Sequence, residues 1–209
     1  MAQRIVVTGT DTGIGKTVFA AGLTALLGAC YWKPVQAGLA EETDSDRVRR
    51  LAELTADRVL PENYRLAEPA SPHRAARLEG IRIDPLSLDP PDTGRPLVIE
   101  GAGGVMVPLD DDTLSLDVFA RWRCPLVLCA RTSLGTINHS LLSLAALRSR
   151  GIDVLGIAFI GDAVAESEET ICRLGKVTRL GRLPWLAPLT ASTLQQAMAA
   201  AFRRKDFAR

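Results

Sequence analysis

The chain has 209 residues, of which 47% are hydrophobic and 23% are charged, and its formal net charge is +1. This size suits one domain with a substantial core, which we expect to span residues 1–209. A net charge so close to zero gives no general attraction for nucleic acid or an anionic membrane, so neither is an expected partner. The first residues run directly into an expected strand and leave no room for a signal peptide. No apolar run approaches the ~18 residues of a membrane-spanning helix.

The cysteines and histidines form no metal-binding pattern. The cysteines are widely spaced and include no Cys-x-x-Cys pair, which predicts small buried side chains in a reducing cytoplasm and argues against disulfides or a zinc site. The two histidines, His73 and His139, lack metal-ligand spacing relative to each other. The cysteines are Cys30, Cys124, Cys129 and Cys172.

The first expected strand, Arg4 to Thr8, breaks into a glycine-rich turn that is followed by Lys16, Thr17 and an apolar helix. A strand, a glycine loop, a Lys-Thr pair and a helix in this order are typical of a phosphate-binding P-loop. The glycines let backbone N–H groups converge, and the helix start adds the positive end of its dipole. We predict that Lys16 reaches the β- and γ-phosphates of a nucleotide and that the Thr17 hydroxyl binds Mg²⁺.

This loop departs from the standard P-loop pattern. Gly9 and Gly15 enclose five residues where the standard pattern has four, and Thr10 stands where a strict match needs glycine. Partitioning and nitrogenase-type ATPases resemble this chain in their loop but carry a second lysine five positions before Lys16. Asp11 occupies that position here.

The remaining elements alternate along the chain. Apolar strands that alternate with helices predict an α/β fold with three layers, in which helices cover both faces of a mostly parallel sheet. Residues 57–95 are rich in proline, poor in strand signal and expected to wrap the surface. The other expected strands are Lys33–Gly38, Pro96–Glu100, Pro125–Ala130, Val154–Ile160 and Val177–Leu183. The expected helices are Val18–Leu27, Arg47–Ala56 (capped by Ser45 or Asp46), a short one from Ser71, Ile137–Arg150 and Thr193–Arg203.

Ligands of such sheets bind at the carboxyl ends of the strands, and polar clusters follow nearly every expected strand. Glu100 ends an apolar strand and is placed like the carboxylate that joins Thr17 at Mg²⁺. Asp44 and Asp46 are both candidates for a second carboxylate, and spacing alone does not separate them. Lys33, followed by a proline and a tight turn, is expected to point at a substrate.

Seven segments resemble dethiobiotin synthetase, the ATP-dependent ring-closing enzyme of biotin synthesis, and they occur in that family's order. The resemblance implies a P-loop NTPase-like fold and a reaction that joins carbon dioxide (or bicarbonate) to 7,8-diaminopelargonate with ATP and Mg²⁺. A carbamate is formed and phosphorylated, and the neighbouring amine closes the ring. The segments are Gly9–Thr17, Lys33–Gly38, Ser45–Asp46, Glu68–His73, Glu100–Gly104, Leu134–His139 and Leu183–Leu186.

The resemblance also implies roles for individual residues. It selects Asp46 over Asp44 as the third magnesium ligand beside Thr17 and Glu100, and it makes Lys33 and Lys16 catalytic. It implies a homodimer with the active site at the interface, where the Leu134–Asn138 segment of a neighbouring subunit holds the substrate carboxylate. The implied nucleotide-binding residues are Gly13, Ile14, Gly15, Lys16, Thr17, Val18, Asp46, Glu100, Gly101, Ala102, Gly103, Gly161, Asp162, Pro184, Trp185 and Leu186. The implied substrate-binding residues are Thr12, Lys33, Ala37, Leu134, Gly135 and Asn138.

Two positions depart from the family. Ala37 stands where members often carry a hydroxyl residue near the substrate. Gly161 and Asp162 stand where an Asn-Asp pair commonly reads adenine, so base discrimination is expected to be modest.

Two alternative functions use a related ATP-binding domain. A cobyrinate or cobyric acid synthetase normally carries an additional glutaminase-like domain, for which 209 residues leave no space. A partitioning ATPase is disfavoured because Asp11 replaces its second lysine.

Overall fold

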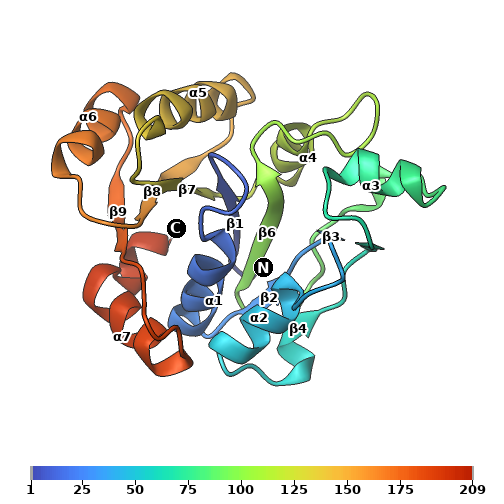
Figure 1. Ribbon diagram of the computed structural model, residues 1–209, viewed down its shortest axis with the longest axis horizontal. Helices are drawn as coiled ribbons and strands as arrows, with labels where there is room; N and C mark the ends of the chain where they lie inside the picture. Colours follow the sequence, from blue (N-terminus) through green and yellow to red (C-terminus); the bar gives the residue numbers. More distant parts are fainter. Residues whose placement is uncertain (1, 209) are drawn as a thin grey trace.

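The computed structural model describes residues 2–208, and its centre is a seven-stranded parallel sheet (Figure 1). The strand order is β4-β2-β6-β1-β7-β8-β9, and every neighbouring pair is parallel. The inner strands are buried along nearly their whole length, as expected for a sheet covered on both faces. The strands are β1 (Arg4–Gly9), β2 (Cys30–Trp32), β4 (Val59–Leu60), β6 (Leu97–Gly104), β7 (Leu126–Arg131), β8 (Val154–Ile160) and β9 (Arg179–Leu183).

Helices cover both faces of this sheet, which confirms the predicted three-layer α/β class (Figure 1). On one face, α1 (Lys16–Leu27), α2 (Asp44–Leu51) and α7 (Ala191–Ala201) enclose a core that contains Phe19 and Met198. On the other face, α4 (Ser115–Trp122), α5 (Thr136–Ser149) and α6 (Ala165–Gly175) enclose a second core around Phe119 and Phe159. None of the described helices is long and apolar enough to cross a membrane.

A small two-stranded parallel sheet lies beside the main one, where the sequence predicted a single strand from Lys33 to Gly38. In the structure β2 ends at Trp32, and β3 (Val35–Ala37) pairs with β5 (Tyr64–Leu66) in the small sheet. Pro34 separates them because it has no N–H to donate to a ladder, while its carbonyl accepts hydrogen bonds from the backbone of residues 63 and 64. The break places Lys33 in the corner between the two sheets.

Several other boundaries differ from the sequence prediction. Helix α2 spans Asp44–Leu51, whereas Arg47–Ala56 was expected. It therefore begins three residues earlier and ends five residues earlier than predicted. Residues 57–95 contain the two short strands β4 and β5, while α3 (Pro72–Leu78) is the expected short helix. Helices α4 and α6 were not predicted. The remaining short turns are 3₁₀-helices at Ala56–Arg58, Pro85–Ser87 and Arg204–Phe207.

Candidate active site

Lys16 is the first residue of α1, and its side chain folds back beneath the P-loop that joins β1 to α1. Its side chain crosses β1 at Gly9, where an added Cβ would approach Lys16 Cδ to 2.8 Å and Ile14 Cδ1 to 2.7 Å. Only glycine leaves this space, so Gly9 permits the lysine to run along the strand end. Lys16 is 6% exposed, and its Nζ donates a hydrogen bond to the Asp11 carbonyl at 2.7 Å.

Burial lowers the pKa of Lys16, and the Lys33 charge lowers it further, while the Glu100 carboxylate opposes the shift. A buried ammonium of this kind gains most from an anion that arrives at the loop, because the low-dielectric surroundings strengthen the attraction. The geometry at Lys16 is therefore that of a phosphate site.

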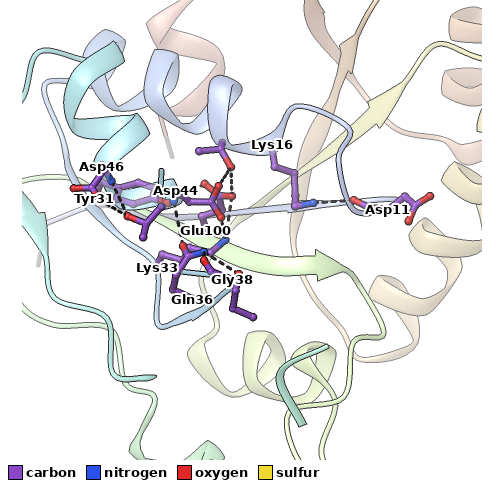
Figure 2. Close-up of polar contacts among 12 residues, drawn as sticks. Asp11, Lys16, Tyr31, Lys33, Gln36, Gly38, Asp44, Asp46 and Glu100 are labelled. Atoms are coloured by element: carbon purple, nitrogen blue, oxygen red, sulfur yellow. Dashed lines mark hydrogen bonds and ion pairs between the residues drawn. The ribbon is translucent and has the colours of Figure 1, made fainter. Parts of the chain in front are cut away.

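Thr17, Asp44, Glu100 and Lys33 meet in one polar network (Figure 2). The Thr17 hydroxyl lies 2.7 Å from Asp44 Oδ1 and 2.8 Å from Glu100 Oε1, so it can donate to either carboxylate. Lys33 Nζ lies 2.8 Å from Asp44 Oδ2 and 3.3 Å from Glu100 Oε1. Two carboxylates thus share one hydroxyl and one ammonium at the start of α1.

The charges of this network stabilise one another. Burial alone would lower the pKa of Lys33, but the carboxylates of Glu100 and Asp44 outweigh it and raise that pKa. For Asp44, burial would raise the pKa, but the Lys33 charge and the hydrogen bonds from Lys33 and Thr17 lower it. Lys33 therefore remains an ammonium and Asp44 a carboxylate at neutral pH.

Asp44, and not Asp46, joins Thr17 and Glu100 in the structure. The choice of Asp46 from the resemblance does not match this geometry, because α2 begins earlier than expected and Thr43 is its N-cap. Asp46 is the third residue of the helix, where its N–H donates to Thr43 Oγ1 at 3.2 Å and its Oδ2 accepts from that hydroxyl at 2.7 Å. The Asp46 side chain is 54% exposed and also pairs with Arg49. Asp46 thus stabilises the N-terminus of α2.

Sequence reasoning missed two side chains that support this network (Figure 2). Gln36 on β3 accepts a hydrogen bond from the Asp44 N–H at 3.1 Å and so holds the start of α2. Tyr31 on β2 is fully buried, and its hydroxyl donates to Glu100 Oε2 at 2.9 Å. A tyrosine in an otherwise apolar strand is the signal that could have found it, since a buried phenol needs a polar partner.

The donors around Thr17 fit a magnesium ion better than a transition metal. The residues from 2 to 208 contain no cluster of three or more His, Cys, Asp or Glu side chains that could hold a metal. Thr17, Asp44 and Glu100 offer only oxygen ligands, and Mg²⁺ completes such a set with phosphate oxygens and water.

A cavity of about 340 Å³ opens beside the P-loop, at the ends of β7 and β8. It brings together Gly13, Ile14, Asp162 and Trp185, which the resemblance assigned to the nucleotide, whereas Gly161, Pro184 and Leu186 are not among its lining residues. Gly161 follows β8 with a φ of 127°, and an added Cβ would lie 2.5 Å from Thr132 Oγ1. The complete lining is Gly13, Ile14, Arg131, Thr132, Ser133, Ile160, Asp162, Val164 and Trp185.

A second cavity, of about 350 Å³, lies between the P-loop, the end of β6 and helix α5. Thr12, which the resemblance assigned to substrate binding, lines it, and His139 lines it from α5. Leu134, Gly135 and Asn138 are exposed at the start of α5, and Leu134 is 101% exposed. Ala37 lies on β3 in the small sheet. The complete lining is Thr10, Asp11, Thr12, Gly104, Val105, Met106, Val107, His139, Leu142, Ser143 and Ala146.

Comparison with known proteins identifies the family. An ATP-dependent dethiobiotin synthetase from Bradyrhizobium sp. (strain BTAi1) is 82% identical over 209 residues, which is 100% of both chains. The chain belongs to the dethiobiotin synthetase family. The dethiobiotin synthetase of Bradyrhizobium diazoefficiens is 62% identical over 99% of each chain, and that of Rhodopseudomonas palustris (strain TIE-1) is 62% identical over 99% of this chain and 98% of its own. A family described as an AAA domain matches residues 3–193.

Membership of the dethiobiotin synthetases makes the chain an ATP-dependent ligase, and full-length identity at this level favours that function over both alternatives. Solved structures share its fold at much lower identity. The cell-division protein MinD from Pyrococcus horikoshii, in complex with Mg-ADP, has a TM-score of 0.55 at 15% identity, over 94% of this chain and 86% of its own. The MinC:MinD complex from Aquifex aeolicus has a TM-score of 0.52 at 13% identity over the same shares. These similarities show a P-loop ATPase fold and nothing further.

Proposed function

We propose that the chain catalyses ring closure of 7,8-diaminopelargonate with carbon dioxide, ATP and Mg²⁺, at a site centred on Lys16, Thr17, Lys33, Asp44 and Glu100. The observation that carries this proposal is the partly buried contact of Thr17 with both carboxylates at the end of the P-loop, 2.7 and 2.8 Å away. These three side chains would hold Mg²⁺, which would neutralise charge on the transferring phosphoryl group. Asp44 replaces Asp46 in this assignment because only Asp44 reaches Thr17.

The reaction divides into three steps. One amine of the substrate attacks carbon dioxide and loses a proton, which gives a carbamate. A carbamate oxygen then takes the γ-phosphoryl group of ATP and releases ADP. Finally the second amine attacks the carbamate carbon, the C–O bond to phosphate breaks, and inorganic phosphate leaves with the cyclic urea formed. No protein nucleophile is needed, because the substrate supplies both amines.

The two lysines supply positive charge to these steps. The carbamate and the transferring phosphoryl group both carry negative charge, which fixed ammonium groups stabilise in a site shielded from water. Lys33 is 4% exposed and its pKa is raised by Glu100 and Asp44 against the effect of burial, so it suits the role of a permanent cation and not of a proton acceptor. Lys16 would reach the phosphates from beneath the loop.

The nucleotide base would occupy the cavity beside Gly13 and Trp185, and the substrate would occupy the cavity beside Thr12 and His139. We assign the second cavity to a homodimer interface. Met106 and Leu142 line it and are 60% and 62% exposed, and Leu134 is more exposed still. Apolar side chains gathered around a cavity are typical of a surface that a second subunit covers. The free N–H groups at the start of α5 would then hold the substrate carboxylate.

Mixing two inactive variants tests whether the neighbouring subunit completes the site. Lys33→Gln and Asn138→Ala each damage a different half of a shared site, so a mixed dimer contains one intact site. Refolded or exchanged mixtures should regain about a quarter of the wild-type activity in a symmetric dimer. A mixture with no more activity than its components, or a fully active monomer in sedimentation, would contradict the shared site.

A coupled assay with diaminopelargonate, bicarbonate, Mg²⁺ and ATP tests the reaction itself. We expect dethiobiotin and ADP in equal amounts, and no product when bicarbonate or the diamine is left out. ATP hydrolysis that continues without the diamine, with no ring product when it is added, would contradict the proposed function. The four free cysteines and the use of ATP support a cytoplasmic location.

A further inference from the structure

The two oxygens of the Glu100 carboxylate have separate partners. Oε1 faces Thr17 Oγ1 at 2.8 Å and Lys33 Nζ at 3.3 Å. Oε2 accepts a hydrogen bond from the Tyr31 hydroxyl at 2.9 Å, on the side away from the P-loop. Tyr31 is thus the partner that occupies the second oxygen (Figure 2).

The position of Tyr31 is fixed by the sheet. It lies in the middle of β2, directly opposite Val98 of β6 on one side and Val59 of β4 on the other. Both Tyr31 and Glu100 are almost completely buried, at 0% and 1% exposure. Pairing with both strands fixes the backbone of Tyr31, and its ring packs in the core on one face of the sheet, so the phenol has little freedom to rotate away and fixes the orientation of the carboxylate.

We propose that Tyr31 is a positioning residue that makes Glu100 a one-oxygen ligand and thereby favours Mg²⁺ over the larger Ca²⁺. The inference rests on the proposed magnesium site. Mg²⁺ requires compact octahedral geometry, to which each carboxylate gives one oxygen, whereas Ca²⁺ often takes both oxygens of a carboxylate. A hydrogen bond that occupies Oε2 therefore leaves Mg²⁺ binding through Oε1 unchanged, but it removes an oxygen ligand that Ca²⁺ can use.

Titration calorimetry of ADP binding tests this role without turnover. ADP is titrated into wild type and Tyr31→Phe in the presence of Mg²⁺, of Ca²⁺, or of a chelator. In wild type, Mg²⁺ should strengthen ADP binding more than Ca²⁺ does. In Tyr31→Phe the gain from Mg²⁺ should fall about tenfold, the range typical for loss of a hydrogen bond to a metal ligand. The gain from Ca²⁺ should remain or increase, and metal-free ADP binding should not change.

Tyr64→Phe is the matched control. It removes one phenolic hydroxyl from β5, where that group accepts a hydrogen bond from the Asp84 N–H and has no contact with Glu100. This variant should keep the wild-type affinities with both metals. Combining Tyr31→Phe with Glu100→Gln gives a second control, because a residue that acts through Glu100 should add no further change in metal response once the carboxylate is gone.

The outcomes separate this inference from the proposed function. If wild type binds ADP equally well with Mg²⁺, Ca²⁺ and chelator, the proposed metal site is wrong. If Mg²⁺ and Ca²⁺ strengthen ADP binding equally in wild type, the selectivity assigned to Tyr31 is overturned, and this holds even if Tyr31→Phe does not fold. If the variant folds and keeps the wild-type ratio of the two metals, Tyr31 has only a structural role.

Discussion

The two ends of the proposed nucleotide site are built in opposite ways. At the phosphate end (Lys16, Thr17, Lys33, Asp44 and Glu100), both lysines and Glu100 are at most 6% exposed, and every charge has a partner. At the base end (Gly161, Asp162 and Trp185), Asp162 is exposed and the indole is 62% exposed. The phosphate end is a fixed network inside the fold, and the base end is the rim of an open cavity.

This difference indicates at which positions the removal of a side chain should have little effect on activity or stability. Removing one member of a buried polar network leaves another charge without its partner, which is costly in a low-dielectric interior. An exposed side chain that is removed is replaced by water. We therefore expect large effects of substitution at the phosphate end and small ones at the base end, and the predictions below test that ranking.

Lys16→Ala should have the largest effect. It removes a buried positive charge at the phosphate site, and loss of one such stabilising group costs at least ~10²-fold in kcat. The measurement is steady-state turnover in the coupled assay, with circular dichroism as the control for folding. Near-normal turnover of a folded Lys16→Ala enzyme would contradict the assignment of the phosphate end.

Lys33→Gln should damage ring closure more than nucleotide binding. Lys33 contacts both carboxylates, and its loss would leave the carbamate without a cation, so we expect kcat to fall about 10²-fold. ADP affinity measured by calorimetry on the same variant should change much less. A variant that loses only nucleotide affinity would show that Lys33 acts on the phosphates alone.

Asp44→Asn and Asp46→Asn form a matched pair two residues apart. Asp44 contacts Thr17 and Lys33, so its loss should raise the Mg²⁺ concentration needed for half-maximal activity at least tenfold. Asp46 contacts Thr43 and Arg49 at the surface, so its loss should cost only about 0.5 kcal/mol of stability and leave the Mg²⁺ response unchanged. The reverse result would restore Asp46 as the magnesium ligand.

Base discrimination should be modest. Gly161 offers only backbone groups, and loss of one neutral side-chain hydrogen bond is worth about 0.5–1.5 kcal/mol, or a few-fold in preference. We expect ATP to be used best, with CTP, GTP and UTP following within about tenfold in kcat/KM. A preference for ATP above ~10³-fold would mean that the base end reads adenine without a matched side chain.

Glu42→Gln should have the smallest effect, although Glu42 has one of the largest pKa shifts. The hydrogen bond from Arg50 is the main cause that lowers its pKa from 4.5 to about 2; burial opposes this shift, and the hydrogen bond from Arg47 adds to it. Because the folded-state pKa is depressed, the stabilisation is present above pH 4.5 and is lost as the pH falls toward 2. The side chain is 32% exposed, so we expect less than about 1 kcal/mol at pH 7. Urea unfolding of both proteins at pH 7 and at pH 3 measures the difference, which should shrink at pH 3.

The central strands and the first helix were predicted well because a single local sequence signal specifies each of them. The β-branched run before the P-loop glycines became β1, the Lys-Thr pair opened α1, and β8 has its predicted bounds. Helices α4 and α6 were not predicted; their N-cap residues are Leu114 and Val164, which are not the residue types that mark a helix start in a sequence. Of the segment expected as a strand at Lys33–Gly38, only Val35–Ala37 form one, because the main-sheet strand β2 ends at Trp32 before Pro34 and β3 pairs in the small sheet.

At the site, spacing left Asp44 and Asp46 open, and a difference of two residues along one helix decides which of them contacts Thr17. Whether Asp44 or Asp46 faces Thr17 depends on where α2 begins, and that depends on Thr43 as its cap. The resemblance matched the Ser45-Asp46 pair to the family and so favoured Asp46, but it did not indicate that Thr43 caps the helix. Tyr31 was missed because its role depends on the pairing of β2 with β6, which brings together residues far apart in the sequence.

The backbone at Gly161 constrains how nucleotide preference could be altered in this enzyme. Any side chain there would meet Thr132 Oγ1 at 2.5 Å and would have to adopt a φ of 127°. Installing an asparagine at this position would therefore not by itself create a side-chain contact to adenine. The Thr132 side chain and the turn after β8 would have to adjust with it, so we expect a side chain at position 161 to be tolerated better together with a smaller residue at 132. Residues 132 and 161 form a coupled pair in which the order and combination of mutations matter.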